Sequence, residues 1–475
     1  MKKRVISFLT AIIMAFSICV AGNFGTIDSH AVSGSIKVIV KGTRYAAESR
    51  KLLTRINEIR KEAYTLRYVD EYVPAKWSYD MEQIAELRAV EATVYMDHTR
   101  PNGESTFTTK SSDGHQSYGE NLAWNSSASA GLEAWYNEKS DYARYDKGEA
   151  VAYTDYGHYW NLINPKNTYV GLSAFKTDGL VCLAAEFTSS DNNTSYTSTK
   201  TGNQSVTIEV LPNSSNVLNV KLSNTSLSMI KGESKTISLK GTLTGYGVWT
   251  IKTAVTPVAT WSSSNTSVAT VNSSGKITAK SAGTAVITAK TSKGTYTCKV
   301  TVKLPVNLSK CKLSLSVTKC SYTGKARLPK VKVTYGSKTL TSDTDYTVTY
   351  SNNIKVGKAT VTIKGKGKYT GTQKLTFNII PRKPTVTLQA KKGGFKVTYQ
   401  KRAANEATHY QIKYSTKKNM SNATWVKVTD RTISSKTIAT KTSNKTYYVR
   451  VRTARKVGST IYYGAWSDVK AIKTK

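Results

Sequence analysis

The segment that decides the fold reads YGENLAW, from Tyr118 to Trp124. Gly119 permits a tight backbone approach, and the apolar side chains of Leu122 and Trp124 are suited to a core. Glu120 is the charged residue among them, which makes it the candidate for a functional side chain. The sequence on either side indicates the kind of domain to which the segment belongs.

Apolar residues recur at helical spacing both before and after this segment. Leu52, Ile56 and Ile59, for example, fall on one face of a helix. Such a stripe is typical of an amphipathic helix that packs on a core. The pattern predicts helices over residues 50–63, 78–93 and 128–142.

The period changes near the end of this region. Residues 169–174 and 180–187 are short, apolar stretches rich in strand-forming residues, which predicts two strands packed against the helices. We therefore expect one α+β domain over residues 46–190.

The remainder of the chain has the pattern of an all-β protein. Residues 191–215 begin as a Ser, Thr and Asn tract, which predicts a solvated linker. Beyond it, alternating segments such as KATVTIK at residues 358–364 are separated by Gly and Asn turns about every ten residues. This pattern predicts tandem antiparallel sandwiches, and about 270 residues suffice for three modules.

The N-terminus predicts export. Three basic residues, Lys2, Lys3 and Arg4, precede a short apolar run from Val5 to Val20, which is typical of a secretory signal peptide. We predict a signal peptide over residues 1–31, with a membrane anchor as the alternative. No later apolar run is long enough to span a bilayer, so we expect no transmembrane segment after signal removal.

The net charge of +39 is unevenly distributed. Residues 45–190 contain 15 Lys and Arg against 21 Asp and Glu, whereas residues 191–475 contain 48 against 8. A basic surface outside the cell attracts anionic cell-wall polymers, phospholipid headgroups and acidic glycans before nucleic acid. We expect wall polymers as partners and no nucleic acid, and the alternative is a soluble surface without a specific ligand.

Cysteines are too few for a disulfide scaffold. Beyond the predicted signal the chain has Cys182, Cys298, Cys311 and Cys320. Cys182 lies in an apolar run and is expected to be a buried small side chain. Cys311 and Cys320 are close enough to bridge neighbouring strands, or they are two free thiols.

Four short motifs in the first domain indicate a family. They are HTRP at residues 98–101, YGENLAW at 118–124, WYNE at 135–138 and GHY at 157–159. In this order and spacing they resemble the CAP superfamily, also called SCP-like or the cysteine-rich secretory, antigen 5 and pathogenesis-related 1 superfamily. The resemblance covers about residues 46–190 and implies an α-β-α sandwich.

The resemblance also implies a cleft in which two histidines and two glutamates meet. Carried over residue by residue, they are His98, Glu120, Glu138 and His158. His115 is an alternative to His98, which we prefer for its Thr-Arg-Pro context.

Such a cluster has two chemical interpretations. Two neutral imidazoles, here His98 and His158, can bind Zn²⁺ with positions left for water, beside a carboxylate base. The same residues can also hydrogen-bond one another without metal. The sequence has no His-Glu-x-x-His motif, so the zinc site depends on the resemblance alone.

With these four as catalytic residues, the protein would be a metal-assisted peptidase or other hydrolase. No Gly-x-Ser-x-Gly or catalytic-cysteine pattern accompanies them. We therefore favour binding of a lipid, peptide or protein ligand over catalysis.

The rear modules carry resemblances of their own. TWSSSN at 260–265 with GKITA at 275–279 looks like a bacterial Ig-like group 2 module over 216–303. Residues 305–380 resemble an Ig-like repeat of Gram-positive surface proteins, and 382–475 look like fibronectin type III. The sequence thus predicts a secreted, cell-surface or cell-wall-associated protein of a Gram-positive-type bacterium, with an adhesin as a further alternative.

Overall fold

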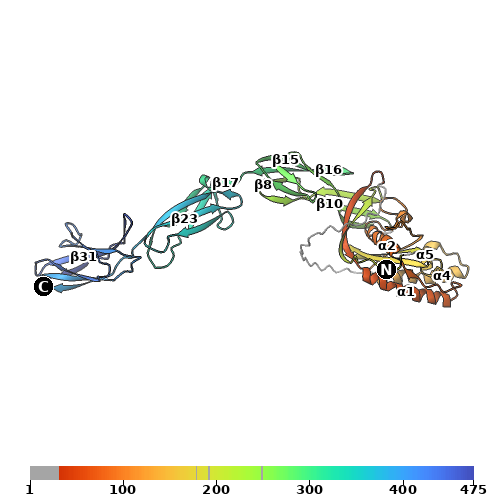
Figure 1. Cartoon of the computed structure of the whole chain (residues 1–475), viewed down its shortest axis with the longest axis horizontal. Helices are drawn as coiled ribbons and strands as arrows, with labels where there is room; N and C mark the ends of the chain where they lie inside the picture. The colour runs from red at the N-terminus through yellow and green to blue at the C-terminus, as the bar shows by residue number, and fades with distance from the viewer. Residues whose placement is uncertain (1–31, 178, 191–192, 248–249) are drawn as a thin grey trace, which may run out of the picture. The chain divides into compact units, whose positions relative to one another are not determined.

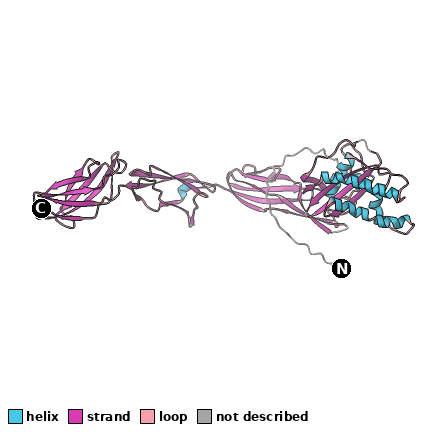
Figure 2. Ribbon diagram, turned by 90° about the horizontal axis from the view of Figure 1, so that it is seen from below, coloured by secondary structure: helices cyan, strands magenta, loops and turns pink. Residues whose placement is uncertain are grey.

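The computed structural model describes residues 32–177, 179–190, 193–247 and 250–475. The predicted signal peptide, residues 1–31, lies outside this part of the chain. The chain forms two compact units: the first holds most described residues up to 301, and the second consists mainly of residues 302–475. Long helices occur only in the first unit among the described residues (Figure 2).

A central sheet organises the N-terminal domain. Its strands run in the order β3-β5-β4-β1, with β3 at the edge. β4 and β5 are buried on both faces, which explains their nearly continuous apolar sequence. The strands are β1 (Ile36–Arg44), β2 (Lys76–Trp77), β3 (Gly119–Asn125), β4 (Tyr169–Thr177) and β5 (Leu180–Thr188).

Helices cover both faces of this sheet (Figure 1). Side chains of α1, α3 and α5 form one core with Leu172, Leu183 and Phe187. α2 forms the other with Phe175 and Ala184. The domain is therefore the predicted α-β-α sandwich. The helices are α1 (Ala46–Thr65), α2 (Tyr79–Glu91), α3 (Ala128–Asn137), α4 (Lys139–Asp146), α5 (Tyr153–Ile163) and the 3₁₀ turn η1 (Thr106–Thr108).

Three parts of the fold that position functional residues differ from the sequence expectation. The predicted helix 128–142 is interrupted at Glu138, which ends α3 and precedes α4. The helix α5 and the strand β3 were not predicted. The aromatic residues of α5 favour a strand, and the Gly, Asn and Glu residues of β3 disfavour one, so local preference did not reveal either element. No helix in the described ranges is long and apolar enough to cross a bilayer.

Strand β1 joins the N-terminal domain to the β-structure that follows. It pairs with β4, with β6 over its whole length and with β11. The sheet therefore continues as β1-β11-β10-β7. The joint is tight, because a Cβ at Gly245 would lie 2.2 Å from the carbonyl oxygen of Val94. The added strands are β6 (Gly202–Val210), β7 (Asn216–Leu222), β10 (Leu239–Tyr246) and β11 (Thr250–Pro257).

The segment predicted as a linker, residues 191–215, is ordered structure over much of its length. It contains β6, and Ser198 is buried against α2. The backbone N–H of Ser198 donates to Glu82 at 2.8 Å, and Lys200 Nζ donates to Glu86 at 3.1 Å. The polar tract thus partners carboxylates of α2, and a solvated linker was the wrong interpretation for this part.

The rest of the chain is all-β, as predicted. In the first unit β12, β15 and β16 form one sheet and β13, β14 and β9 another. These modules contain β8 (Ser226–Ile230), β9 (Ser234–Thr236), β12 (Thr260–Ser263), β13 (Ala269–Val271), β14 (Lys276–Ala279), β15 (Gly283–Thr291) and β16 (Gly294–Lys303).

The second unit contains two further pairs of sheets. In one pair β18-β20-β21 faces β19-β25-β23-β22, and in the other β26-β27-β30 faces β29-β28-β31-β32, with β33 also on β31. The elements are β17 (Val306–Asn307), η2 (Leu308–Lys310), β18 (Lys312–Leu315), β19 (Lys319–Ser321), β20 (Val331–Tyr335), β21 (Lys338–Thr339), β22 (Tyr346–Ser351), β23 (Gly357–Gly365), β24 (Tyr369–Thr370), β25 (Thr372–Ile380), β26 (Val386–Lys391), β27 (Gly394–Tyr399), β28 (His409–Ser415), β29 (Thr424–Val428), β30 (Ser435–Ala439), β31 (Thr446–Val457), β32 (Thr460–Tyr463) and β33 (Lys470–Lys473).

The four described cysteines are free thiols. Cys311 and Cys320 are therefore not bridged in this structure, which selects the second of the two alternatives. Cys182 is buried in the core beside α2, as expected, and burial raises the pKa of its thiol.

Candidate functional site

The first half of the candidate site is a pair formed by His98 and Glu120. Glu120 is the second residue of β3, and His98 lies in the loop after α2. The Nδ1 atom of His98 is 2.8 Å from Oε1 of Glu120. The two side chains differ in exposure: 54% for His98 and 1% for Glu120. The imidazole is thus the part of this pair that a ligand can reach.

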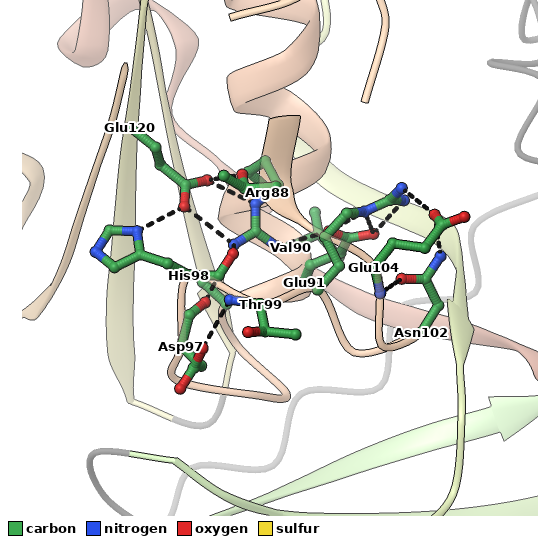
Figure 3. A network of polar contacts seen from close by, with 12 residues as sticks. Arg88, Val90, Glu91, Asp97, His98, Thr99, Asn102, Glu104 and Glu120 are labelled. Atoms are coloured by element: carbon green, nitrogen blue, oxygen red, sulfur yellow. Dashed lines mark hydrogen bonds and ion pairs between the residues drawn. The ribbon is translucent and has the colours of Figure 1, made fainter. Parts of the chain in front are cut away.

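Glu120 contacts Arg88 of α2 (Figure 3) and Thr106 of the turn η1 on the side away from solvent. Arg88 Nε donates to its Oε2 at 2.6 Å, and the Thr106 hydroxyl donates to the same oxygen at 2.6 Å. Burial alone would raise the pKa of Glu120. The charge of Arg88 and the hydrogen bonds from His98, Arg88 and Thr106 outweigh it and lower this pKa well below the usual range. Glu120 is therefore a fixed anion.

The network continues from Arg88 away from the imidazole (Figure 3). Arg88 Nη1 donates to Glu91 at 2.7 Å, and Arg100 Nη2 donates to the other oxygen of Glu91 at 2.8 Å. Arg100 also contacts Glu104 at 2.9 Å. Two arginines and their carboxylates alternate through the buried interior, so each charge has a partner of opposite sign.

The second half of the site is a pair formed by His158 and Glu138. His158 lies on α5, and Glu138 occupies the junction of α3 and α4. The Nδ1 atom of His158 is 2.6 Å from Oε1 of Glu138, and the other carboxylate oxygen accepts the backbone N–H groups of His158 and Tyr159. The His158 ring stacks on Trp135 with centroids 6.4 Å apart. Rotation of this imidazole is therefore restricted.

The two pairs meet at the end of the edge strand β3. The ring centroids of His98 and His158 are 5.8 Å apart, so all four predicted residues lie in one cluster. His115 lies elsewhere: its Nδ1 is 2.6 Å from Asp80 at the beginning of α2. The structure thus places His98, and not His115, beside Glu120. We call His98, Glu120, Glu138 and His158 the His/Glu cluster.

A fifth carboxylate lies behind the cluster. Glu186 on β5 is paired in register with Glu120 on β3, and it is fully buried. Burial, and next the negative charge of Glu120, raise the pKa of Glu186 well above its usual range. Glu186 therefore favours the neutral, protonated form more than an ordinary carboxyl group does, whereas Glu120 favours the ionised form.

Sequence reasoning missed the residues that hold the cluster from inside. Arg88, Glu91 and Glu186 are nearly or fully buried, and none belongs to the four motifs. An arginine three residues before a glutamate on α2 was the available signal. It resembles an ordinary exposed i,i+3 pair, because the sequence does not show which face of α2 is covered.

The His/Glu cluster has some, but not all, of the features of a zinc site. Each histidine directs Nδ1 to a carboxylate, which is the arrangement that orients Nε2 of zinc-ligating histidines. Zinc sites with an open position usually have three protein ligands. Among the described residues, no group of three or more His, Cys, Asp or Glu is arranged to hold a metal ion.

The contacts also limit covalent chemistry. Within the described part of the chain, neither His98 nor His158 is hydrogen-bonded to a Ser, Thr or Cys side chain. A nucleophile activated by histidine would need such a contact. A cavity of about 90 Å³ lies elsewhere, lined by Met96, Cys182, Thr253 and their neighbours, and touches none of the cluster.

Comparison with known proteins identifies the N-terminal domain. Residues 53–183 match the family model for CAP, the cysteine-rich secretory protein family. The chain carries a CAP domain. The His/Glu cluster and β3 to β5 lie within the matched residues or a few positions beyond them. β1 and β6, which complete the sheet of the CAP domain, lie outside the match.

The region behind the CAP domain has looser matches. Residues 258–295 match the model for the immunoglobulin-like domain of intimin. The bacterial Ig-like group 2 assignment for 216–303 stays a prediction. No curated protein matched the chain.

Solved structures similar to the chain include fibronectin type III domains. A two-domain segment of chicken tenascin is 10% identical, with a TM-score of 0.27, and covers 34% of this chain and 98% of its own. The fn3 domain of human contactin 1 is 21% identical, with a TM-score of 0.17, and covers 19% and 76%.

Proposed function

We propose that this is an extracellular protein whose CAP domain recognises a ligand through the His/Glu cluster, while its basic β-modules attract it to anionic cell-wall polymers. The observation that supports recognition is the state of the two carboxylates. Both are engaged by histidine, and Glu120 is also engaged by Arg88 and Thr106. Neither is left to act as a base on a substrate.

The exposed imidazole of His98 and the half-buried imidazole of His158 supply the recognition chemistry. When Nδ1 is held by a carboxylate, Nε2 of a neutral imidazole accepts a hydrogen bond, and in the charged form it donates one. Two such groups about 6 Å apart by ring centroid suit a ligand that carries polar atoms at a similar spacing. Lipid headgroups, peptides and proteins all carry such atoms.

A metal-assisted peptidase or hydrolase is the second candidate, and one observation favours it. Both imidazoles have the carboxylate partner typical of zinc ligands. His98 and His158 would hold the ion, and Zn²⁺ would supply a bound water of lowered pKa.

This second candidate predicts that Zn²⁺ binds once per chain, more weakly than at sites with three protein ligands, because only two imidazoles are offered. Calorimetric titration of ZnCl₂ into the chain from residue 32 onward measures this. His98→Ala with His158→Ala should abolish the heat, and His115→Ala, a similarly exposed histidine paired with Asp80, should retain it. If the wild-type chain binds no zinc, the hydrolase candidate loses its support and recognition without metal remains.

The attraction to the wall rests on charge. Residues 191–475 carry 48 Lys and Arg against 8 Asp and Glu, and such an excess attracts polyanions over several ångströms. The Debye length falls from about 10 Å at 0.1 M salt to about 3 Å at 1 M, so attachment by charge must weaken as salt increases.

We expect the protein to bind isolated Gram-positive cell walls at about 0.1 M salt and to leave them at about 1 M. Sedimentation of the walls followed by protein assay measures the bound fraction. Walls from which the anionic polymers have been extracted are the control and should bind little. Retention at 1 M salt would contradict attachment by charge and favour an adhesin with specific protein contacts.

A further inference from the structure

One face of the last β-module combines cations and aromatic rings. In the sheet β29-β28-β31, Tyr410 and Ile412 point to the core of the module. The neighbouring positions point to the opposite face, where Trp425, Lys413 and Arg450 lie side by side in register. The next row on this face is formed by Lys427, Gln411 and Arg452.

Aromatic rings lie close to the cations of both rows. The guanidinium carbon of Arg452 is 3.8 Å from the ring centroid of Tyr463 and 4.6 Å from that of Trp466. Arg450 is 4.8 Å from Trp466, and Lys413 Nζ is 5.2 Å from Trp425. These are cation–π distances. Trp425 is 51% exposed, so one broad ring remains open to solvent.

The positive charge of this face is not neutralised within the module. Residues 382–475, all of them described, contain 22 Lys and Arg and three carboxylates. Glu406 pairs with Arg382, Asp468 with Lys383, and Asp430 accepts hydrogen bonds from Thr432. The carboxylates therefore have partners away from Arg450 and Arg452.

We infer that this face binds an acidic polysaccharide, a chain of pyranose rings that carry carboxylates. Arginine binds carboxylate with two parallel hydrogen bonds, and an exposed aromatic ring offers an apolar surface for the C–H face of a sugar. Aromatic rings and cations alternate across the neighbouring strands of this face. In an acidic polysaccharide, apolar sugar faces and carboxylates likewise alternate along the chain, so each kind of group can meet its partner. The inference rests on the proposed attraction of the basic modules to polyanions and gives it a specific site.

The aromatic part of the face separates this ligand from other polyanions. A flexible phosphate polymer or an acidic peptide satisfies the cations but has no sugar ring to stack on Trp425. If charge alone mattered, any lysine-rich surface of the rear modules would serve equally well.

The test is binding of an oligogalacturonate of about ten sugars to the full chain, measured by calorimetry at about 0.15 M salt. Trp425→Ala removes the ring and leaves the charge, so we expect its affinity to fall at least fivefold. Lys427→Ala removes a charge on this face and should weaken binding two- to threefold. Lys436→Ala removes an exposed lysine on β30 of the other sheet and should change binding little.

Polyglutamate and polyphosphate of equal charge are the comparison ligands, and both should bind more weakly than the oligogalacturonate. Equal binding of the three polymers, or unchanged binding by Trp425→Ala, would overturn the inference and leave the aromatic rings a structural role. A thermal melt of each variant shows whether the module is intact. The two proposals can fail separately. If the protein stays on the walls at about 1 M salt but its sugar binding depends on Trp425, the wall proposal is overturned and the polysaccharide site remains.

Discussion

A chain that begins at Ala46, and therefore lacks β1, is expected to lose the folded CAP domain. Ile36, Val38 and Val40 of this strand are each at most 2% exposed and pack in the core with α2. Burial of such side chains contributes about 1.5–3 kcal/mol each, so the deletion removes roughly 5–9 kcal/mol. That is comparable with the whole stability of a typical domain, about 5–15 kcal/mol.

Circular dichroism at 222 nm reports this change selectively, because all α-helices of the described chain lie in the CAP domain. We expect the deletion to abolish the helical signal and its cooperative melt. A chain that starts at residue 32 and ends before residue 382 is the matched control, and it should retain both. A chain from Ala46 onward that melts cooperatively with full helical signal would contradict the role assigned to β1.

The same strand shows where reasoning from sequence reaches its limit. The alternation of Ile36, Val38 and Val40 with Lys37 and Lys41 is a recognisable strand pattern. Its partners are not recognisable, because pairing with β6 and β11 is a long-range contact that leaves no local signal. Because this pairing could not be predicted, β1 was left outside the domain that was predicted to begin at residue 46. For the same reason, the segment that contains β6 was predicted to be a linker over residues 191–215.

The candidate site also has a part that was predicted from sequence and a part that was not. His98, Glu120, Glu138 and His158 were predicted from short motifs, and the structure gathers them at one end of β3. The motifs identified these four residues because their types and order carry the family resemblance, whether the side chain is exposed, as in His98, or buried, as in Glu120. The buried charges behind them could not be predicted. Arg88, for example, has the spacing of a residue on the polar, solvent-facing side of an amphipathic helix, because the local sequence does not show that other parts of the domain cover that side.

Arg88→Ala is the second change that we expect to lower the free energy of unfolding by a large amount. Arg88 is fully buried and contacts Glu120 and Glu91 at 2.6 and 2.7 Å. Its removal leaves two buried carboxylates without their shared cation, which costs about 3–5 kcal/mol in comparable buried pairs. Urea unfolding followed at 222 nm measures the loss. Arg144→Ala is the control, since its pairs with Asp141 and Glu149 are exposed and screened by solvent, so this change should alter the free energy of unfolding little.

The loss of unfolding free energy in Arg88→Ala has two possible sources, the charge of Arg88 and the packing of its side chain. The pH dependence of this loss distinguishes them. The pKa of Glu120 is lowered in the folded chain, so its ion pair stabilises the fold above the unfolded pKa of about 4.3 and ceases to do so as pH falls through the lower folded value. The difference in unfolding free energy between wild type and Arg88→Ala should therefore narrow between about pH 4 and pH 2. A difference that stays constant over this range would mean that Arg88 acts through packing, and that Glu120 is not the fixed anion on which the orientation of His98 depends.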